Sequence, residues 1–123
     1  MRWLLSKARR SNPAAHSLLD VGAGSGLLVA EAKRLNFNAV GVEPSHSLVR
    51  LARRLYKVDL LQGVFPYPML LNHQFDVIFL VDIIEHVSNP AVLLQHCAAA
   101  VAPNGIIILV TPNAGSLVKK LLG

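Results

Sequence analysis

Short apolar runs alternate with amphipathic stretches along most of this chain, and the alternation indicates its secondary structure. The apolar runs that predict strands are residues 17–21, 39–42, 58–63, 75–81 and 106–110. Helical spacing of apolar residues follows at 25–35, after Ser45 and from Pro90 onward. Strands that alternate with helices in this way form a parallel sheet with right-handed crossovers and helices on both faces. The pattern therefore predicts an α/β fold.

The connecting segments carry signals of their own. Residues 1–15 predict a short helix or an irregular lead-in that ends at Asn12-Pro13. Residues 65–74 predict a surface loop, and 103–105 predict a turn. After the last apolar run, residues 114–122 predict the start of another helix.

The helix that follows Ser45 divides most clearly into apolar and basic positions. Its apolar positions at i, i+3, i+4 and i+7 are Leu48, Leu51, Ala52 and Leu55. A basic set with the same spacing is Arg50, Arg53, Arg54 and Lys57. The ordinary interpretation is a packed helix with a solvated basic face. The alternative, which also includes the cations Arg2, Lys7, Arg9 and Arg10 near the start of the chain, is an acidic partner such as a nucleic acid or an anionic membrane surface. Nucleic acid is not expected, because no aromatic residues interleave with these cations.

Composition narrows the class of protein. A chain of 123 residues is one domain at most. Hydrophobic residues make up 53% and charged residues 15%, which suits a parallel sheet covered on both faces or a piece of a larger protein. No apolar run approaches the ~20 residues that a membrane span needs, and the apolar stretch at residues 3–5 is too short for a secretory signal, so we expect the cytoplasm. The one cysteine, Cys97, falls on an apolar helix face and is expected in the core.

The stretch SLLDVGAGSG is the first candidate for a binding site. It encloses Asp20 in a strand and continues with Gly22, Gly24 and Gly26 before a helical pattern. Glycine accepts positive φ and lets a ligand approach the main chain closely, and the N–H groups of a helix start face such a ligand. The dinucleotide fingerprint needs Gly or Ala at its sixth position, where this chain has Leu27. The spacing thus disfavours a dinucleotide, and a plain tight turn stays the alternative.

A second acid stands at the end of the second strand. Glu43 lies about 20 residues beyond the glycine turn, where a carboxylate can accept hydrogen bonds from both ribose hydroxyls. The alternative is that Glu43 only favours the positive end of the helix that follows. With Asp20 and the glycines upstream, we favour the ribose.

Three segments carry a family resemblance. The pattern apolar-apolar-Asp-apolar-Gly-x-Gly-x-Gly resembles motif I of the class I S-adenosyl-L-methionine-dependent methyltransferases, and GVEPS resembles their motif II. FDVIFLVDIIEHVSNP and PNGIIILVTPN resemble motifs IV to VI of the small-molecule enzymes, which include the ubiquinone-biosynthesis O-methyltransferases. The resemblance covers residues 18–113, nearly the whole chain. It implies methyl transfer to a small-molecule acceptor.

The resemblance implies a three-layer Rossmann-like fold with a parallel sheet in the order 3-2-1-4-5. A cofactor crevice would then lie between strands one and four, lined by the first-strand loop and the fourth-strand tip. The implied residues around S-adenosyl-L-methionine are Asp20, Gly22, Ala23, Gly24, Gly26, Glu43, Pro44, Val64, Phe65, Val81 and Asp82. Many family members place an Asp after strand three to meet the adenine amino group. Here Val64 and Phe65 stand there, so main-chain groups and Phe65 are expected to hold adenine.

The segment after the fourth strand offers titratable groups. His86 is the candidate general base, because an imidazole titrates near neutral pH. The quinone-type enzymes have a similar acidic-x-x-Glu-His arrangement, which implies a divalent cation on Asp82, Glu85 and His86 as a second hypothesis. The third is that Glu85 and His86 are packing residues of a helix start that closes the pocket.

The family sheet has seven strands, and this chain ends shortly after Asn113. We therefore expect a truncated or partner-completed domain that lacks strands six and seven. Its fifth strand would be an apolar edge covered by a second copy or a partner chain. Two alternatives stay open, a non-catalytic remnant that binds the cofactor weakly and an NAD(P)-binding oxidoreductase fragment. Leu27 and the EHVSNP segment disfavour the latter.

Overall fold

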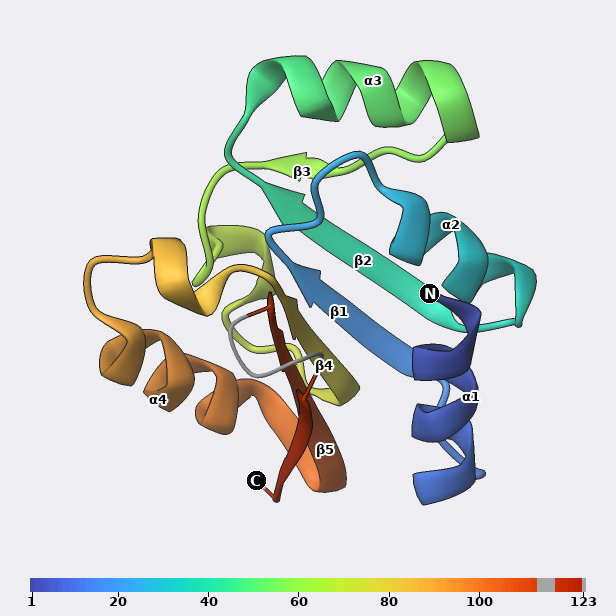
Figure 1. The fold of residues 1–123 in the computed structure, drawn as a ribbon, viewed down its shortest axis with the longest axis vertical. Helices are drawn as coiled ribbons and strands as arrows, with labels where there is room; N and C mark the ends of the chain where they lie inside the picture. The colour runs from blue at the N-terminus through green and yellow to red at the C-terminus, as the bar shows by residue number, and fades with distance from the viewer. Residues whose placement is uncertain (113–116, 123) are drawn as a thin grey trace.

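The computed structural model describes residues 1–112 and the backbone of residues 117–122. Its strands form one sheet in the order β3-β2-β1-β4-β5-β6 (Figure 1). The first five strands run parallel, and they are β1 (Ser17–Val21), β2 (Asn38–Glu43), β3 (Leu61–Gln62), β4 (Phe75–Val81) and β5 (Val101–Thr111). This confirms the α/β class and the order 3-2-1-4-5.

Helices cover both faces of the sheet and make three layers (Figure 1). The helices are α1 (Arg2–Ser11), α2 (Leu27–Arg34), α3 (His46–Tyr56) and α4 (Pro90–Ala100), with short 3₁₀ turns at η1 (Pro68–Leu70) and η2 (Ile84–His86). Buried residues of α1, α2 and α3 join one core cluster, and those of α4 join the other. The lead-in is thus a helix, which settles the choice left open by the sequence.

Side chains alternate along the strands, so successive residues pack into the two core clusters on opposite faces of the sheet. Leu18 and Phe79 point to the layer of α1 and α2, whereas Leu19 and Ile78 point to the layer of α4. All four side chains are fully buried. Strands buried on both faces read as continuous apolar runs, which is why the FDVIFLV segment shows no polar alternation.

Two of the helix starts follow their sequence signals. The Ser45 Oγ accepts a hydrogen bond from the Leu48 N–H at 3.3 Å, and the Asn89 Oδ1 accepts one from the Val92 N–H at 3.2 Å. Pro90 occupies the first turn of α4, where its missing N–H costs nothing. These caps set where α3 and α4 begin and hence where the preceding loops end.

The segment after β5 corrects the sequence prediction. Residues 117–122 form strand β6 (Leu117–Leu122), which pairs antiparallel with β5 from Ile106↔Leu122 to Thr111↔Leu117. The expected helix is therefore wrong for these residues, and residues 114–116 lie outside the described part. The expectations that no sixth strand follows and that β5 is an open edge are also wrong. The unpaired N–H and C=O groups of β5 offer backbone partners that local helix preference cannot match.

Two further boundaries differ from the sequence prediction. The third strand is only two residues long, because its pairing with β2 is confined to Val42↔Leu61 and Glu43↔Gln62. The predicted turn at 103–105 is a bulge inside β5 rather than a break before it. Phe75 pairs with Val101 and Val77 with Ile106, and Asn104 has φ of 65°. The extra residues loop out while the pairing with β4 continues on both sides.

A reciprocal hydrogen-bond clamp joins the amino ends of β1 and β4. The Asp76 Oδ2 accepts from the N–H groups of His16 at 2.9 Å and Ser17 at 3.1 Å. In return the Asp76 N–H donates to the Ser17 Oγ at 2.8 Å. Partial burial alone would raise the pKa of Asp76, but these bonds hold it below its usual value. The clamp fixes the register of the two strands whose other ends form the candidate site.

In the described ranges, no helix has both the length and the apolar character that crossing a membrane requires.

Candidate functional site

The carboxyl ends of β1, β2 and β4 meet at one edge of the sheet. Val21 lies beside Val42 in β2 and beside Leu80 in β4, so the residues that follow these strands are neighbours. The loop after β1 is the glycine turn, and the loop after β4 contains η2. Ligands of doubly wound sheets bind at such an edge, where the strand order reverses.

The three glycines of the turn all have positive φ, but their surroundings differ. Gly22, Gly24 and Gly26 have φ of 71°, 59° and 85°. A Cβ on Gly22 would lie 2.5 Å from the Ile83 Cδ1, and one on Gly26 would lie 2.9 Å from the Ala52 Cβ. A Cβ on Gly24 would meet nothing within 4 Å. Gly22 and Gly26 thus permit close packing, whereas Gly24 faces open space.

Glu43 ties the glycine turn to the end of β2. Its Oε1 accepts the Gly24 N–H and its Oε2 accepts the Ser45 N–H, each at 2.8 Å. The side chain is largely buried. A carboxylate has about four acceptor sites, so each oxygen keeps one for a further donor. Glu43 can therefore hold the turn and still accept two hydroxyl groups.

Asp20 is a buried acid with unused hydrogen-bonding capacity. It is 3% exposed, and its Oδ1 has no hydrogen-bond partner within the described residues. Burial raises the pKa of Asp20 to about 8, and the Glu43 carboxylate adds to the rise. An unsatisfied buried oxygen in a native fold needs an explanation, and a donor absent from the free chain is one.

A cavity of about 300 Å³ opens beside the turn. Its walls come from the ends of β1 and β2, from the loop after β3, from the loop after β4 and from α4. The lining residues are Val21, Gly22, Val42, Pro44, Gly63, Val64, Phe65, Ile83, His86, Val87 and Leu93. The volume is at the lower end of the range for small-molecule sites, and the walls are mostly apolar.

The buried acids and the apolar cavity lie on opposite faces of the sheet. By strand alternation Asp20 shares the face of Leu18, toward α2, whereas Val21 shares the face of Leu19, toward α4. The two acids therefore lie on the α2 side, and the apolar cavity lies on the α4 side. A ligand with an apolar ring and a polar sugar could span the edge with each part in matching surroundings.

Five of the predicted site residues line the cavity, namely Gly22, Pro44, Val64, Phe65 and His86. Two others, Ala23 and Gly26, direct their Cβ positions into packed surroundings, against Gly41 and Ala52 respectively. Only their main-chain groups are available to a ligand. Sequence reasoning missed six lining residues, which are Val21, Val42, Gly63, Ile83, Val87 and Leu93. For Val21 and Val42 the available signal was their position as the last apolar residues before the polar strand ends.

Asp82 stands at the tip of β4 in a strained conformation. Its φ is 55°, in the left-handed region, and its N–H donates to the Val110 carbonyl at 2.9 Å. Val81 just before it is half-buried. Asp tolerates this region better than most residues, and strain held by neighbouring structure concentrates at functional sites. The turn re-aims the chain so that Ile83 lies over Gly22.

His86 lies at the cavity with its ring largely exposed. The Nε2 of His86 is 3.7 Å from the Glu85 Oε1. Across residues 1–112, no three His, Cys, Asp or Glu side chains are close enough together to hold a metal ion. The structure thus does not gather Asp82, Glu85 and His86 into one cluster, and the base and cation hypotheses for this segment both stay predictions.

Fold and site together define a doubly wound α/β domain with an apolar cavity and two buried acids at its switch point. A family model described as a methyltransferase domain matches residues 1–123. Because the match runs over the whole chain, the chain belongs to this family of methyltransferase domains.

Curated relatives agree with the family assignment. The chain is 30% identical over 105 residues to the ubiquinone biosynthesis O-methyltransferase of Bradyrhizobium diazoefficiens. It is 32% identical over 101 residues to the enzyme of the same name from Azorhizobium caulinodans. Each match covers 78% of this chain and 40% of the relative. The chain thus spans about 40% of the length of the curated relatives it matches.

Solved structures show the same fold. An amino pentose methyltransferase from Micromonospora echinaspora, solved with S-adenosyl-L-methionine bound, aligns with a TM-score of 0.76 and 27% identity. That alignment covers 89% of this chain and 48% of the other. A sugar N-methyltransferase from Streptoalloteichus aligns with a TM-score of 0.75 at 24% identity, over 89% of this chain and 46% of that one. The latter likeness is one of fold alone.

Proposed function

We propose that this chain is the cofactor-binding part of an S-adenosyl-L-methionine-dependent methyltransferase that acts on a small-molecule acceptor. The observation that carries the proposal is Glu43, a buried carboxylate that holds the open glycine turn and keeps an acceptor site on each oxygen. Family membership and the fold of the S-adenosyl-L-methionine-bound relative support it.

The residues present fit this cofactor. Glu43 would accept the ribose hydroxyls, and the apolar cavity at Val64 and Phe65 would take the adenine ring. The open face of Gly24 would let the cofactor approach the main chain. Asp20, whose Oδ1 finds no hydrogen-bond partner in the part of the chain that the structure describes, would meet positive charge at the methionine end. When bound, S-adenosyl-L-methionine supplies a sulfonium methyl group that is already activated for in-line displacement.

The chain's own residues then have two tasks. Positioning is the larger one, because an activated donor mainly requires that the reacting groups be held in line. The second is proton removal from an acceptor hydroxyl, which we assign to His86 at the mouth of the cavity. The relatives that share about 30% identity are O-methyltransferases by name, which supports an oxygen acceptor.

Calorimetric titration of the folded chain with S-adenosyl-L-methionine and, separately, with NAD tests the proposal. We expect S-adenosyl-L-methionine to bind one to one and NAD not to bind. Glu43→Ala removes charged hydrogen bonds worth about 1.5–3 kcal/mol each, so affinity should fall by at least about tenfold. Circular dichroism establishes that the variant is folded. Binding of NAD instead, or no binding by the folded parent chain, would refute the assignment.

A variant that is expected to bind the cofactor more tightly tests the proposal without relying on a loss of binding. Val64 lines the cavity and is 67% exposed, so an acid is tolerated there. Val64→Asp would supply the carboxylate that many family members direct at the adenine amino group. One added hydrogen bond of about 1 kcal/mol should tighten S-adenosyl-L-methionine roughly fivefold. Val64→Asn is the uncharged control, and weaker binding by the Asp variant would exclude adenine from this wall.

A further inference from the structure

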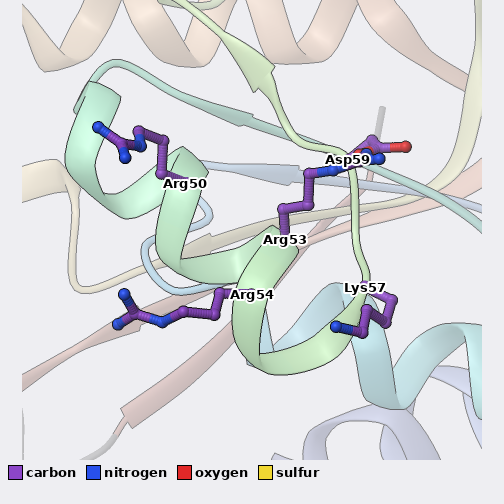
Figure 2. A pocket seen from close by; sticks show the side chains of 5 residues that line it. All are labelled: Arg50, Arg53, Arg54, Lys57 and Asp59. Atoms are coloured by element: carbon purple, nitrogen blue, oxygen red, sulfur yellow. The ribbon is translucent and has the colours of Figure 1, made fainter.

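The outward face of α3 carries a concentration of positive charge that the proposed methyl transfer does not use. Four of the chain's twelve lysine and arginine residues lie there or one residue beyond, and we call them the α3 basic face: Arg50, Arg53, Arg54 and Lys57. In Figure 2 Arg50 and Arg54 project to the same side of the helix, and Arg53 reaches toward Asp59.

Most of this charge is not neutralised. Asp59 forms an ion pair with Arg53, which fastens the end of α3 to the segment before β3. Over residues 1–112, no carboxylate lies within ion-pair distance of Arg50, Arg54 or Lys57. Arg53 thus has a structural role, whereas Arg50 and Arg54 are available to a partner.

Apolar side chains flank these cations. Ala52 alone in α3 is fully buried, and Val49 and Tyr56 pack on the core. Leu48 and Leu51 are only half-buried, and Leu55 is 54% exposed. These three leucines follow one side of the helix at spacings of three and four residues. The helix therefore presents a row of leucines that the described fold leaves partly uncovered.

Two hollows lie along this side of α3, and one of them combines cations with leucines. It has a volume of about 370 Å³ and is lined by Leu48, Leu51, Arg50 and Arg54, together with Ser47. The other, of about 530 Å³, is lined only by the α3 basic face and Asp59 (Figure 2). Arg50 and Arg54 belong to both. Their position between a hollow that includes leucines and one lined by charged groups matches a ligand that joins an anionic head to an apolar body.

We propose that α3 docks the protein on an anionic phospholipid surface. Amphipathic helices that bind such surfaces combine leucines with a Lys/Arg-rich polar face. Arg50 and Arg54 would meet the headgroup phosphates, and Leu51 and Leu55 would enter the boundary beneath them. Nucleic acid explains the cations but not the leucines, and α3 exposes no aromatic platform, because Tyr56 packs on the core.

Vesicle co-sedimentation of the full chain tests the docking surface without cofactor. The vesicles are phosphatidylcholine alone or with roughly one-third phosphatidylglycerol. We expect binding to the anionic vesicles only, and its loss at about 0.5 M salt. Each cation near such a surface contributes on the order of fivefold in partition, so the double variant Arg50→Gln/Arg54→Gln should bind roughly 30-fold more weakly.

Two further variants separate charge, apolar contact and general effects. Lys7→Gln/Arg10→Gln removes the same net charge from exposed positions of α1 and should bind like the parent. Leu55→Gln keeps the charge and should weaken binding about threefold or more. Equal binding to neutral vesicles, or an equal loss in the α1 control, would overturn the proposal. A double-stranded oligonucleotide that displaces the vesicles and binds through Arg50 and Arg54 would overturn lipid as the occupant. None of these outcomes bears on the proposed function, which the calorimetric titration with S-adenosyl-L-methionine tests separately.

Discussion

The glycine pattern after β1 is a single sequence signal, but its three glycines have different roles in the structure. Gly22, Gly24 and Gly26 share positive φ, so the backbone alone requires glycine at each. Their neighbours then divide them: Ile83 presses on Gly22, Ala52 presses on Gly26, and Gly24 faces open space. This division leads to opposite expectations for the same substitution.

Gly24→Ala and Gly26→Ala form a matched pair. Both impose an unfavourable φ on alanine, at a cost of about 1–2 kcal/mol. Gly26→Ala also forces its methyl against Ala52, which adds about 1–3 kcal/mol to the loss in the free energy of unfolding. Gly24→Ala instead places its methyl where the cofactor should approach, so S-adenosyl-L-methionine affinity should fall at least about tenfold with the smaller loss of stability. Urea unfolding and calorimetry measure the two quantities.

The assignment would be contradicted if each of the two substitutions had the effect expected of the other. If folded Gly26→Ala loses cofactor binding while Gly24→Ala keeps it, the ligand approaches the helix start rather than the middle of the turn. Val77→Ala is a control, because it removes buried volume in the amino-terminal half of β4, where Val77 pairs with Leu18 rather than with the end of β1. It should lower stability and leave the affinity of the folded chain unchanged.

Asp20 should make stability depend on pH in an unusual direction. Burial raises its pKa to about 8 in the folded chain from an ordinary value of 3.8, so the folded state binds more protons between these values. Its contribution is thus fully present below about pH 4 and falls as pH rises toward 8, by up to about 1.4 kcal/mol per pH unit. Asp20→Asn removes this dependence. Denaturant unfolding of both proteins from pH 5 to 8 measures the difference.

The expected result is a variant whose stability relative to the parent grows steadily across that range. A constant difference between the two proteins would show that Asp20 is ionised in the folded chain. Glu43 is the charged neighbour that raises the pKa of Asp20, so Glu43→Gln should reduce the parent's pH dependence without removing it.

Among the contacts between elements, the hydrogen-bond clamp at the amino ends of β1 and β4 is the clearest to test by substitution. Asp76→Asn replaces an oxygen that accepts two N–H groups and should cost about 1–3 kcal/mol. Because the folded pKa of Asp76 is lowered, the contribution is present above its ordinary pKa and is lost as pH falls through the folded value. Thermal melts recorded at decreasing pH from pH 7 should therefore show a difference between the two proteins that shrinks in acid. A difference that does not shrink at any pH at which both proteins stay folded would mean that the charge is irrelevant.

Elements also differ in how far local sequence specifies them. The apolar runs of β1 and β4, Ser45 before α3 and Pro90 at the start of α4 predicted their elements directly. Residues 117–122 carry a short apolar–Lys–Lys–apolar pattern that suits a helix start as well as a strand. Only pairing with β5 decides between them, because the ladder supplies partners that no local property reports.

For the whole molecule, cofactor binding should appear as a rise in thermal stability. A ligand that binds only the folded state at 100 times its Kd adds about 2.7 kcal/mol to the free energy of unfolding. For a domain of this size that corresponds to an increase in Tm of roughly 10 °C. Differential scanning fluorimetry with S-adenosyl-L-methionine measures it, with NAD as the matched control. An equal shift with NAD would reject the methyltransferase assignment of the site.

The amino-acid pattern by itself determined the α/β class, the glycine turn, the acid at the tip of β2 and the charged segment after β4. These follow from local physics, since strand and helix periods, caps and positive φ depend on near neighbours. Tertiary structure alone decided that the apolar cavity lies on the α4 side and the acids on the α2 side. It also decided that Ile83 lies over Gly22, that the Asp20 Oδ1 has no hydrogen-bond partner among the described residues and that β6 covers β5. Each of these depends on which distant segments meet, and sheet pairing rather than any local preference sets that.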